Sequence, residues 1–256
     1  MSKEPDNDED LAEGTLLSHL IELRGRLLKV AAAVVLVFIM LLPFARRIFS
    51  LVSEPLREFL PGQQMIATEV ASPLLTPFKL TFFVALFIAM PVVLYQVWAF
   101  VAPGLYRKEK RFAFPLLATS ILLFYLGIAF AYYVVFPLMF SFFTSVAPEG
   151  VEVMTDISHF LSFITMIVLA FGLAFEVPVA TVLLVWTGLT TIEKLSKARP
   201  YVFLGAFVVG MFLTPPDIIS QTLLAVPVYL LYECGIIMSR IFSRKPEEAE
   251  ESAAVK

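Results

Sequence analysis

The chain has 256 residues, of which 59% are hydrophobic and only 16% are charged. Soluble domains average roughly 45–50% apolar and about 25% charged residues, so this composition excludes an ordinary soluble protein and indicates a membrane protein. Acidic tails at both ends dominate the net charge of −3, and the single cysteine, Cys234, excludes a disulfide framework and a cysteine zinc cluster.

Apolar stretches divide the chain into six predicted membrane spans. A hydrocarbon core of about 30 Å needs roughly 20 apolar helical residues, and a spanning segment must satisfy its own backbone hydrogen bonds, so we predict helices. The sequence therefore predicts an all-α polytopic membrane protein, with one membrane domain at 17–240 between acidic tails at 1–16 and 241–256. The expected spans are 27–45, 78–101, 113–137, 159–187, 201–213 and 218–238.

The distribution of lysine and arginine predicts the orientation. Basic residues gather before the first span, between the second and third, between the fourth and fifth, and after the sixth, whereas the 138–158 loop has none. Cytoplasmic loops carry an excess of basic residues, so we expect these four segments and both termini in the cytoplasm. The basic residues are Arg24, Arg26, Lys29, Arg107, Lys108, Lys110, Arg111, Lys194, Lys197, Arg199, Arg240, Arg244 and Lys245.

The fifth predicted span, 201–213, is short. At about 1.5 Å per residue it reaches on the order of 20 Å, less than a hydrocarbon core. The sequence Thr214-Pro215-Pro216-Asp217 follows it and predicts a tight hairpin, because neither proline can donate a backbone hydrogen bond, with Asp217 as the N-cap of the next helix. We expect two short helices that form one re-entering unit, where the bilayer thins or longer neighbours shield the fifth span.

Two charged motifs lie on the predicted cytoplasmic side. HLIELRGRLL, residues 19–28, places Glu22 and Arg26 four apart on a helix, which by itself indicates an interfacial helix with an ion pair worth about 0.3–0.5 kcal/mol. FVAPGLYRKEKR, residues 100–111, places Glu109 among four basic residues, which is typical of a solvated cluster that fixes topology. The residues alone leave a binding role open for both motifs.

Glu176 lies inside the apolar run VLAFGLAFEVPVA, residues 168–180. An ionised acid at membrane depth costs at least a few kcal/mol, so Glu176 is a functional candidate, and a structural polar contact or a protonated acid is the alternative. Pro178 removes one backbone hydrogen bond. We expect it to kink the helix and to open a water-accessible pocket beside the acid.

Several of these motifs together resemble the TatC family of the twin-arginine protein translocase. The resemblance covers about residues 17–240 and implies a cup- or glove-shaped six-helix bundle in the bacterial cytoplasmic membrane. It implies a receptor that binds the twin-arginine signal peptides of folded precursors, recruits the single-span proteins TatB and TatA, works beside other copies of itself and uses the proton-motive force. The motifs are HLIELRGRLL, MIATEVASPLLTPFKL, PVVLYQVWAFVAPGLYRKEKR, AFGLAFEVPV and RPYVFLGAFVVGMFLTPPDIISQTLLAVPVYLLYE.

The resemblance assigns the signal-peptide site to Glu22 and Glu109. A carboxylate can take the planar fork of a guanidinium bidentately, whereas an ammonium is a point charge, so two such acids would prefer Arg-Arg to Lys-Lys. By the same analogy Phe100 and Leu105 offer apolar contacts to the signal, and Arg24 orients the acid.

The resemblance also places sites within the membrane. Glu176 would face the concave side of the bundle and hold water or a polar residue of a partner. Tyr132 and Asp217 match further family positions, with a packed aromatic and a helix cap as their alternatives. The docking site for the TatB or TatA helix would consist of Met211, Thr214 and Gln221.

Two other classes of protein remain alternatives. An ion-coupled transporter would also need an intramembrane acid, but it would usually add midplane polar residues and a discontinuous helix pair. A membrane enzyme would need a catalytic constellation, and only His19, His159 and Cys234 are available, far apart and without metal-ligand spacing. We therefore expect no enzymatic activity, no metal or cofactor, and no nucleic-acid partner.

Overall fold

The computed structural model describes residues 7–57, 65–101, 113–146, 155–214 and 217–243, and these are almost entirely helical. The all-α class is therefore confirmed. A 3-10 turn, Leu42–Phe44, joins the first two helices, and a π-helical turn, Ala131–Val135, joins α4 to α5. The helices are α1 (Asn7–Leu41), α2 (Ala45–Arg57), α3 (Ser72–Val101), α4 (Ala113–Phe130), α5 (Phe136–Val146), α6 (Ile157–Ala174), α7 (Val177–Trp186), α8 (Ile192–Leu213) and α9 (Ile218–Ser243).

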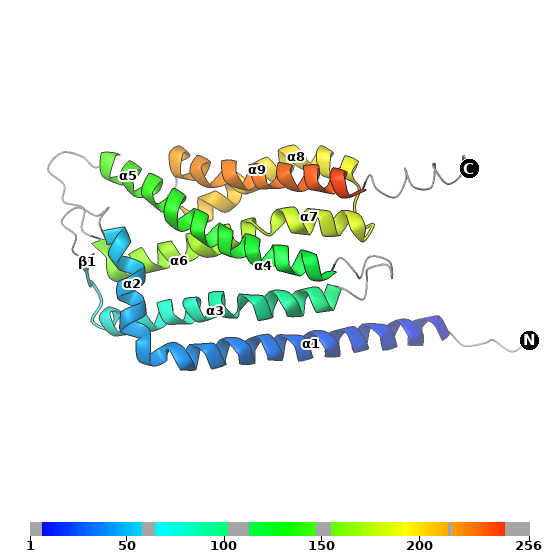
Figure 1. Cartoon of the computed structure of the whole chain (residues 1–256), viewed down its shortest axis with the longest axis horizontal. Coiled ribbons are helices and arrows are strands. Elements are labelled where there is room, and N and C mark those ends of the chain that lie inside the picture. Colours follow the sequence, from blue (N-terminus) through cyan, green and yellow to red (C-terminus); the bar gives the residue numbers. More distant parts are fainter. Residues whose placement is uncertain (1–6, 58–64, 102–112, 147–154, 215–216, 244–256) are drawn as a thin grey trace, which may run out of the picture.

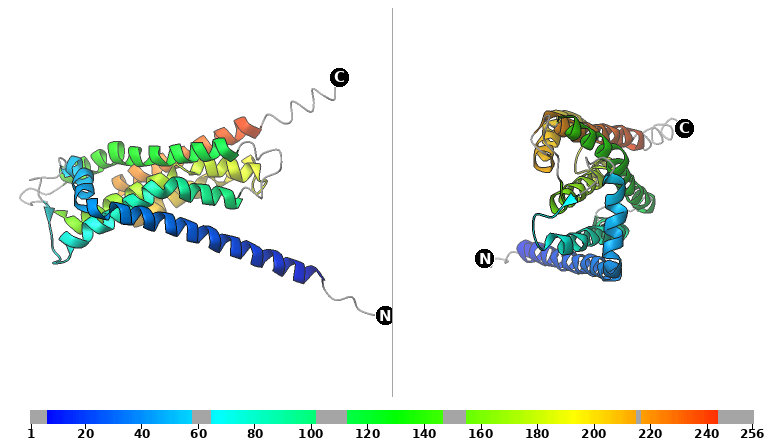
Figure 2. Two further views of the ribbon diagram at one scale, coloured as in Figure 1. Left: turned by 60° about the horizontal axis from the view of Figure 1, so that its bottom comes forward. Right: turned by 90° about the vertical axis from the view of Figure 1, so that its left-hand side faces the viewer.

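Most of the helices run along the long axis of the molecule, and α2 crosses them at one end (Figure 1). The helix α1 packs mainly on α3, α4 packs on α6, and both α7 and α8 pack on α9. Seen end-on, α1 and α3 form one arm and α8 and α9 the other, with α6 and α7 between them (Figure 2). This open arrangement agrees with the expected cup-shaped bundle.

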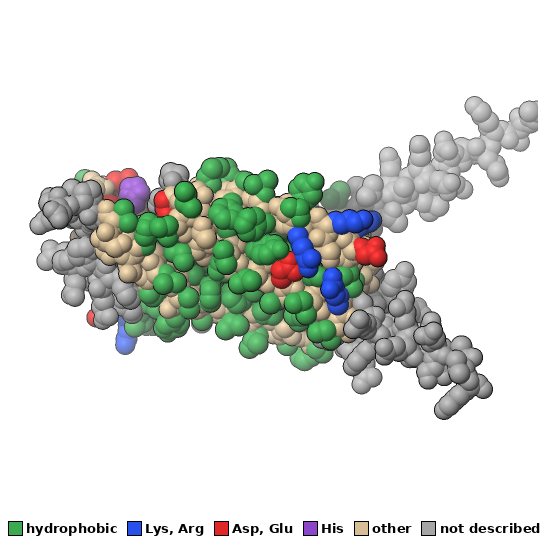
Figure 3. All heavy atoms as spheres, turned by 90° about the horizontal axis from the view of Figure 1, so that it is seen from above, with side chains coloured by type: hydrophobic (Ala, Val, Ile, Leu, Met, Phe, Trp, Pro, Cys, Tyr) green, Lys and Arg blue, Asp and Glu red, His purple; other side chains and the backbone are tan. Residues whose placement is uncertain are grey.

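Five helical stretches are long and apolar enough to cross a membrane: Leu20–Glu54, Ser72–Phe100, Phe114–Val146, Ile157–Trp186 and Ile218–Ile241. They match the first four predicted spans and the sixth, apart from one residue at an end of three of them. On the face shown in Figure 3, hydrophobic side chains cover the middle of the molecule and charged side chains gather toward its ends. A span needs such a charge-free band, because charged groups are costly in hydrocarbon.

The helix of the fifth span is longer than the apolar stretch that predicted it. The helix α8 has 22 residues and begins at Ile192, because the side chain of Thr191 accepts a hydrogen bond from the backbone of Lys194 and caps the helix. Its first half is charged, so α8 is not among the five apolar stretches and only its second half is a short apolar segment. The helix α9 has 26 residues and is also longer than expected.

The fourth span is interrupted where the sequence predicts a kink. The helix α6 ends at Ala174 and α7 begins at Val177, with Glu176 in the joint. Pro178 has no backbone N–H to continue the hydrogen-bond ladder of α6. The third predicted span is not interrupted: its helix continues through the π-helical turn as far as Val146.

Two glycines let α4 and α6 approach closely. A Cβ added to Gly127 would lie 2.5 Å from the backbone oxygen of Phe171, and a Cβ added to Gly172 would lie 2.7 Å from the Phe124 ring. Phe124 and Phe171 are both fully buried in this interface. The close crossing fixes the distance between the two helices on which the intramembrane site is built.

We predict that Gly127→Ala destabilises the folded protein. Its new methyl group would meet backbone rather than a movable side chain, and overpacking of this kind typically costs about 1–3 kcal/mol. Thermal unfolding in detergent should show a lower midpoint for this variant. Gly205→Ala is the control, because a Cβ on Gly205 would meet nothing within 4 Å; equal midpoints for the two variants would contradict the tight crossing.

A short strand pair lies at the end of the molecule where α2 crosses it. Residues Met65–Ile66 (β1) pair in parallel with Thr155–Asp156 (β2). The Asp156 carboxylate accepts hydrogen bonds from the backbone N–H and the hydroxyl of Thr68, at 2.9 and 2.7 Å, and it caps α6 through Ser158 and His159. These hydrogen bonds, those from Thr68 first, lower the pKa of the Asp156 carboxyl below its usual range.

Candidate functional site

Glu22 lies on α1, where the structure shows an ion pair with Arg26. The carboxylate Oε1 accepts from Arg26 Nη2 at 2.6 Å and from Nε at 3.0 Å. Arg26 also donates to the backbone oxygen of Ala99 at 3.0 Å and contacts the Gln96 side chain at 3.4 Å. Arg26, rather than Arg24, therefore orients the acid and ties α1 to the last turns of α3.

The second predicted acid, Glu109, lies outside the described residues, as does Leu105. The segment that contains them connects the end of α3 to the start of α4. Phe100 lies in the last turn of α3, next to the Ala99 carbonyl that Arg26 contacts. The structure thus brings Glu22 to the helix end that leads directly into the segment of Glu109.

Glu176 contacts α4 from the joint between α6 and α7. Its Oε2 accepts a hydrogen bond from the hydroxyl of Ser120, which is almost fully buried. Within the described ranges, its other oxygen, Oε1, is buried without a hydrogen-bond partner. A buried polar atom left unpaired costs about 1–3 kcal/mol, so this oxygen would gain from a water molecule or from a polar group of another chain. Nothing in the sequence identified Ser120.

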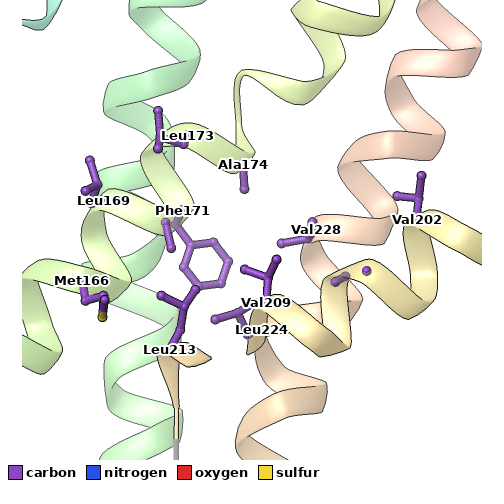
Figure 4. Close-up of a pocket in the computed structure, with 13 residues that line it drawn as sticks. Met166, Leu169, Phe171, Leu173, Ala174, Val202, Val209, Leu213, Leu224 and Val228 are labelled. Carbon is purple, nitrogen blue, oxygen red and sulfur yellow. The ribbon is translucent and has the colours of Figure 1, made fainter. Parts of the chain in front are cut away.

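An apolar cavity of about 600 Å³ lies near this joint, between α6, α8 and α9 (Figure 4). Ala174, the last residue of α6, lines it together with residues such as Phe171, Val209 and Leu224. Glu176 is not among the lining residues, because its carboxylate is turned to Ser120. This cavity is apolar, so the water-accessible pocket expected beside the acid stays a prediction.

The predicted docking residues meet where α8 ends and α9 begins. A Cβ on Gly210 would lie 3.7 Å from the Cα of Gln221, so the two helices touch there. Thr214 is buried and its hydroxyl donates to the Gly210 carbonyl at 2.9 Å. Gln221 is partly exposed and Met211 is half exposed, so the structure brings the three residues to one helix junction with only part of the set accessible.

Asp217 and Tyr132, the two further positions that the resemblance indicated, each contact a neighbouring residue. Asp217 caps α9, because its Oδ1 accepts from the Ser220 backbone N–H at 2.7 Å, and the predicted cap is confirmed. Tyr132 lies in the π-helical turn, partly buried, with its ring packed edge-on against Phe136 at a centroid distance of 6.4 Å. Over the described ranges, no group of three or more His, Cys, Asp or Glu residues could hold a metal ion.

A second acid within a membrane span, Glu233 in α9, was missed by the sequence analysis. Its Oε1 lies 2.7 Å from Arg199 Nε, and its Oε2 accepts from Arg199 Nη2 at 2.8 Å. The signal was present, because Glu233 is a lone acid in the apolar run VYLLYECGII, residues 228–237, just as Glu176 is in its own run.

Comparisons with known proteins agree with this architecture. Residues 18–227 match the family model of "Sec-independent protein translocase protein (TatC)". The chain is 58% identical over 255 residues to the TatC protein of Azotobacter chroococcum mcd 1, covering 99% of this chain and 97% of that protein. It is 58% identical over 237 residues to TatC of Escherichia coli K12, covering 92% of each chain.

A solved structure shares the fold. It is described as "Crystal Structure of Twin Arginine Translocase Receptor- TatC", is 36% identical in sequence and superposes with a TM-score of 0.80. The match covers 88% of this chain and 100% of the solved chain. With a family match over most of its length, this multi-pass membrane protein belongs to the TatC family, the non-enzymatic components of the Sec-independent protein translocase.

Proposed function

We propose that this chain is the receptor subunit of a twin-arginine translocase and binds the signal peptides of folded precursors at the end of the bundle that holds Glu22. The observation that supports this most is the placement of Glu22. Its side chain is 38% exposed, and Arg26 fixes it against the last turns of α3. There the acid is accessible, held in place and close to the helix end from which the chain continues to Glu109.

The chemistry of the site favours paired arginines. Arg26 reaches only one oxygen of Glu22, Oε1. The remaining lone pairs of the carboxylate can take a second guanidinium, whose flat fork matches a carboxylate better than an ammonium does. With Glu109 as the second acid, two arginines of a signal would each find one carboxylate, and Phe100 and Leu105 would supply apolar contacts.

We propose that this end of the bundle faces the cytoplasm across a bacterial inner membrane. The described chain begins with α1 and finishes with α9 at this same end (Figure 1). The basic residues of α8 and the last turns of α9, Lys194, Lys197, Arg199 and Arg240, lie toward it, in agreement with the positive-inside rule. Both termini, with tails at 1–16 and 241–256 around a membrane domain at 17–240, would then be cytoplasmic.

A crosslinking experiment tests the receptor proposal. A photoreactive amino acid at Leu23, an exposed position beside Glu22, should crosslink to a twin-arginine signal peptide. The same probe at Ile39, which is even more exposed but lies about four turns further along α1, is the control and should give little product. A peptide with Lys-Lys in place of Arg-Arg should crosslink weakly at Leu23, and equal products from both peptides would refute arginine recognition there.

We further propose that TatB or TatA docks where α8 meets α9, within a complex that holds other copies of this chain and is driven by the proton-motive force. Gln221 and Met211 are accessible there beside Thr214. Polar contacts between membrane helices contribute about 1–2 kcal/mol in model peptides. That is enough to direct a partner helix to this junction without making the contact permanent.

We predict that Thr214→Val together with Gln221→Leu reduces crosslinking of TatB or TatA at this junction severalfold, because both polar groups are lost while the shape of the threonine is kept. Signal-peptide binding should be unchanged, since Glu22 lies elsewhere. Thr222→Val is the matched control, because that threonine is partly exposed on α9, as Gln221 is, and its hydroxyl donates to its own helix at the Ile218 carbonyl. Loss of signal binding with intact partner crosslinks would place the docking site on other helices.

A further inference from the structure

Three side chains form a polar cluster between α8 and α9, which we call the clasp: Arg199, Tyr229 and Glu233. Arg199 engages both oxygens of Glu233, with Nε 2.7 Å from Oε1 and Nη2 donating to Oε2 at 2.8 Å. The Tyr229 hydroxyl donates to the same Oε1 at 2.8 Å. The carboxylate thus has charged or polar partners on both of its oxygens.

The clasp lies at the edge of the membrane-spanning region. Glu233 is inside the apolar stretch Ile218–Ile241, and its side chain is only 23% exposed, against 39% for Arg199. Charged groups are costly in hydrocarbon. Loss of one partner therefore leaves the other charge uncompensated, and this is more damaging than the absence of both.

Two further contacts join α8 to α9, one in the first half of α8 and one at its middle. The buried hydroxyl of Tyr232 donates to the Leu195 carbonyl at 2.8 Å, and the Tyr229 ring packs edge-on against Phe203 with centroids 5.4 Å apart. Across the described part of both helices, the side-chain hydrogen bonds and ion pairs between α8 and α9 all lie in the first half of α8. The second half of α8 has no such polar anchor.

The opposite side of α8 offers little support. The helix α8 packs closely on α9, whereas it contacts α6 only slightly. The apolar cavity lies between α6 and the α8–α9 pair (Figure 4). The position of α8 therefore depends on α9. At the far end of the pair Gly210 meets Gln221, so a shift of α8 along α9 would separate the residues at that junction.

We propose that the clasp sets the position of α8 along α9, with Glu233 as the positioning residue, and thereby holds Thr214 and Gln221 together as one docking patch. The placement of the helix stands on the contacts alone. Its consequence for docking rests on the proposed function, and the test keeps the two apart.

A disulfide reports the placement without any partner protein. A Cβ on Gly210 would lie 3.9 Å from the Cβ of Gln221, within the range of about 3.5–4.5 Å that a disulfide needs. In a Cys234→Ser background, Gly210→Cys with Gln221→Cys should form a disulfide rapidly under mild oxidation. Adding Glu233→Leu should slow its formation severalfold, because Arg199 loses its partner and α8 shifts toward water.

Two variants separate charge pairing from packing. Glu193→Leu removes an exposed acid from the first turn of α8 and should leave the rate of disulfide formation unchanged. Exchanging the charges, Arg199→Glu with Glu233→Arg, should recover most of the lost rate, which a role in packing alone would not. If Glu233→Leu does not accumulate, Glu233→Gln keeps the shape of the side chain and should also slow the reaction.

The outcomes decide the proposal. An unchanged disulfide rate in the Glu233 variants, or failure of the exchange to recover it, overturns the positioning role. Partner crosslinking at Gln221 is measured separately in Glu233→Gln without the introduced cysteines, and it should fall with the disulfide rate. A slow disulfide with normal TatB or TatA crosslinking supports the placement of α8 by the clasp and refutes the docking patch.

Discussion

Replacing Glu22 and Glu109 together by alanine should abolish measurable binding of a twin-arginine signal peptide while the protein remains inserted in the membrane. A hydrogen bond to a charged group contributes about 1.5–3 kcal/mol, and 1.4 kcal/mol corresponds to about a factor of ten in affinity. Each single change should therefore weaken binding roughly tenfold or more, and the double change should weaken it further. The measurement is titration of a fluorescent signal peptide against purified protein at equal folded concentration.

The structure explains why insertion should survive the change at Glu22. The acid pairs with Arg26, which keeps its contacts with Gln96 and with the Ala99 carbonyl when the acid is removed. An exposed helix pair of this spacing contributes only about 0.3–0.5 kcal/mol. Glu193→Ala is the control, because Glu193 is an exposed acid that the clasp and the signal site do not use. Normal binding by the stable double variant would remove both acids from the signal site.

A sharper variant tests the role of charge. Glu109→Gln keeps the shape of the side chain and removes its charge, so it should lose most of the affinity if bidentate ion pairing dominates. Near-normal binding would show that shape and hydrogen bonding, rather than charge, select the arginines. The same change at Glu22 would additionally release Arg26 from its ion pair, so Glu109 gives the cleaner measurement.

The membrane spans could be predicted from sequence because long apolar stretches have few alternatives in a bilayer. Helix limits outside the bilayer were less predictable, because they depend on local caps. Thr191 extends α8 back to Ile192 through one side-chain hydrogen bond, although the first half of α8 is charged. The β1–β2 pair joins residues 65–66 to 155–156, and no local pattern indicates such a distant partner.

The contacts at the candidate sites were also predictable only where they are local in sequence. The Glu22–Arg26 pair followed from its spacing of four residues on a helix. The partner of Glu176 did not, because Ser120 is 56 residues away in sequence and reaches the acid only through the tight α4–α6 crossing. Glu233 carried the same signal as Glu176, and its pairing with Arg199 depends on the packing of α8 against α9.

Glu176→Gln should retain part of the transport activity, and Glu176→Leu should lose nearly all of it. The reason is the pairing seen in the joint between α6 and α7. An amide can still accept the hydrogen bond from Ser120 through its oxygen and can donate to water or to a partner through its nitrogen, whereas leucine can do neither. Leucine would also leave the buried Ser120 hydroxyl without its partner. Transport should be compared at equal abundance of the variants in the membrane.

A proton relay through Glu176 predicts different relative transport activities for these two variants. A relay needs a titrating group, so glutamine would then be as inactive as leucine, and transport by the parent protein would depend on pH. Glu233 lies in a neighbouring helix, and Gly235 of that helix packs on Pro178, two residues from Glu176. However, its carboxylate is already engaged by Arg199 and Tyr229, which favours a structural role over a relay step. Ser120→Ala separates the cases further: it should reduce transport if Glu176 acts through its hydrogen bonds and have little effect on a relay. Full activity of Glu176→Leu would eliminate both roles.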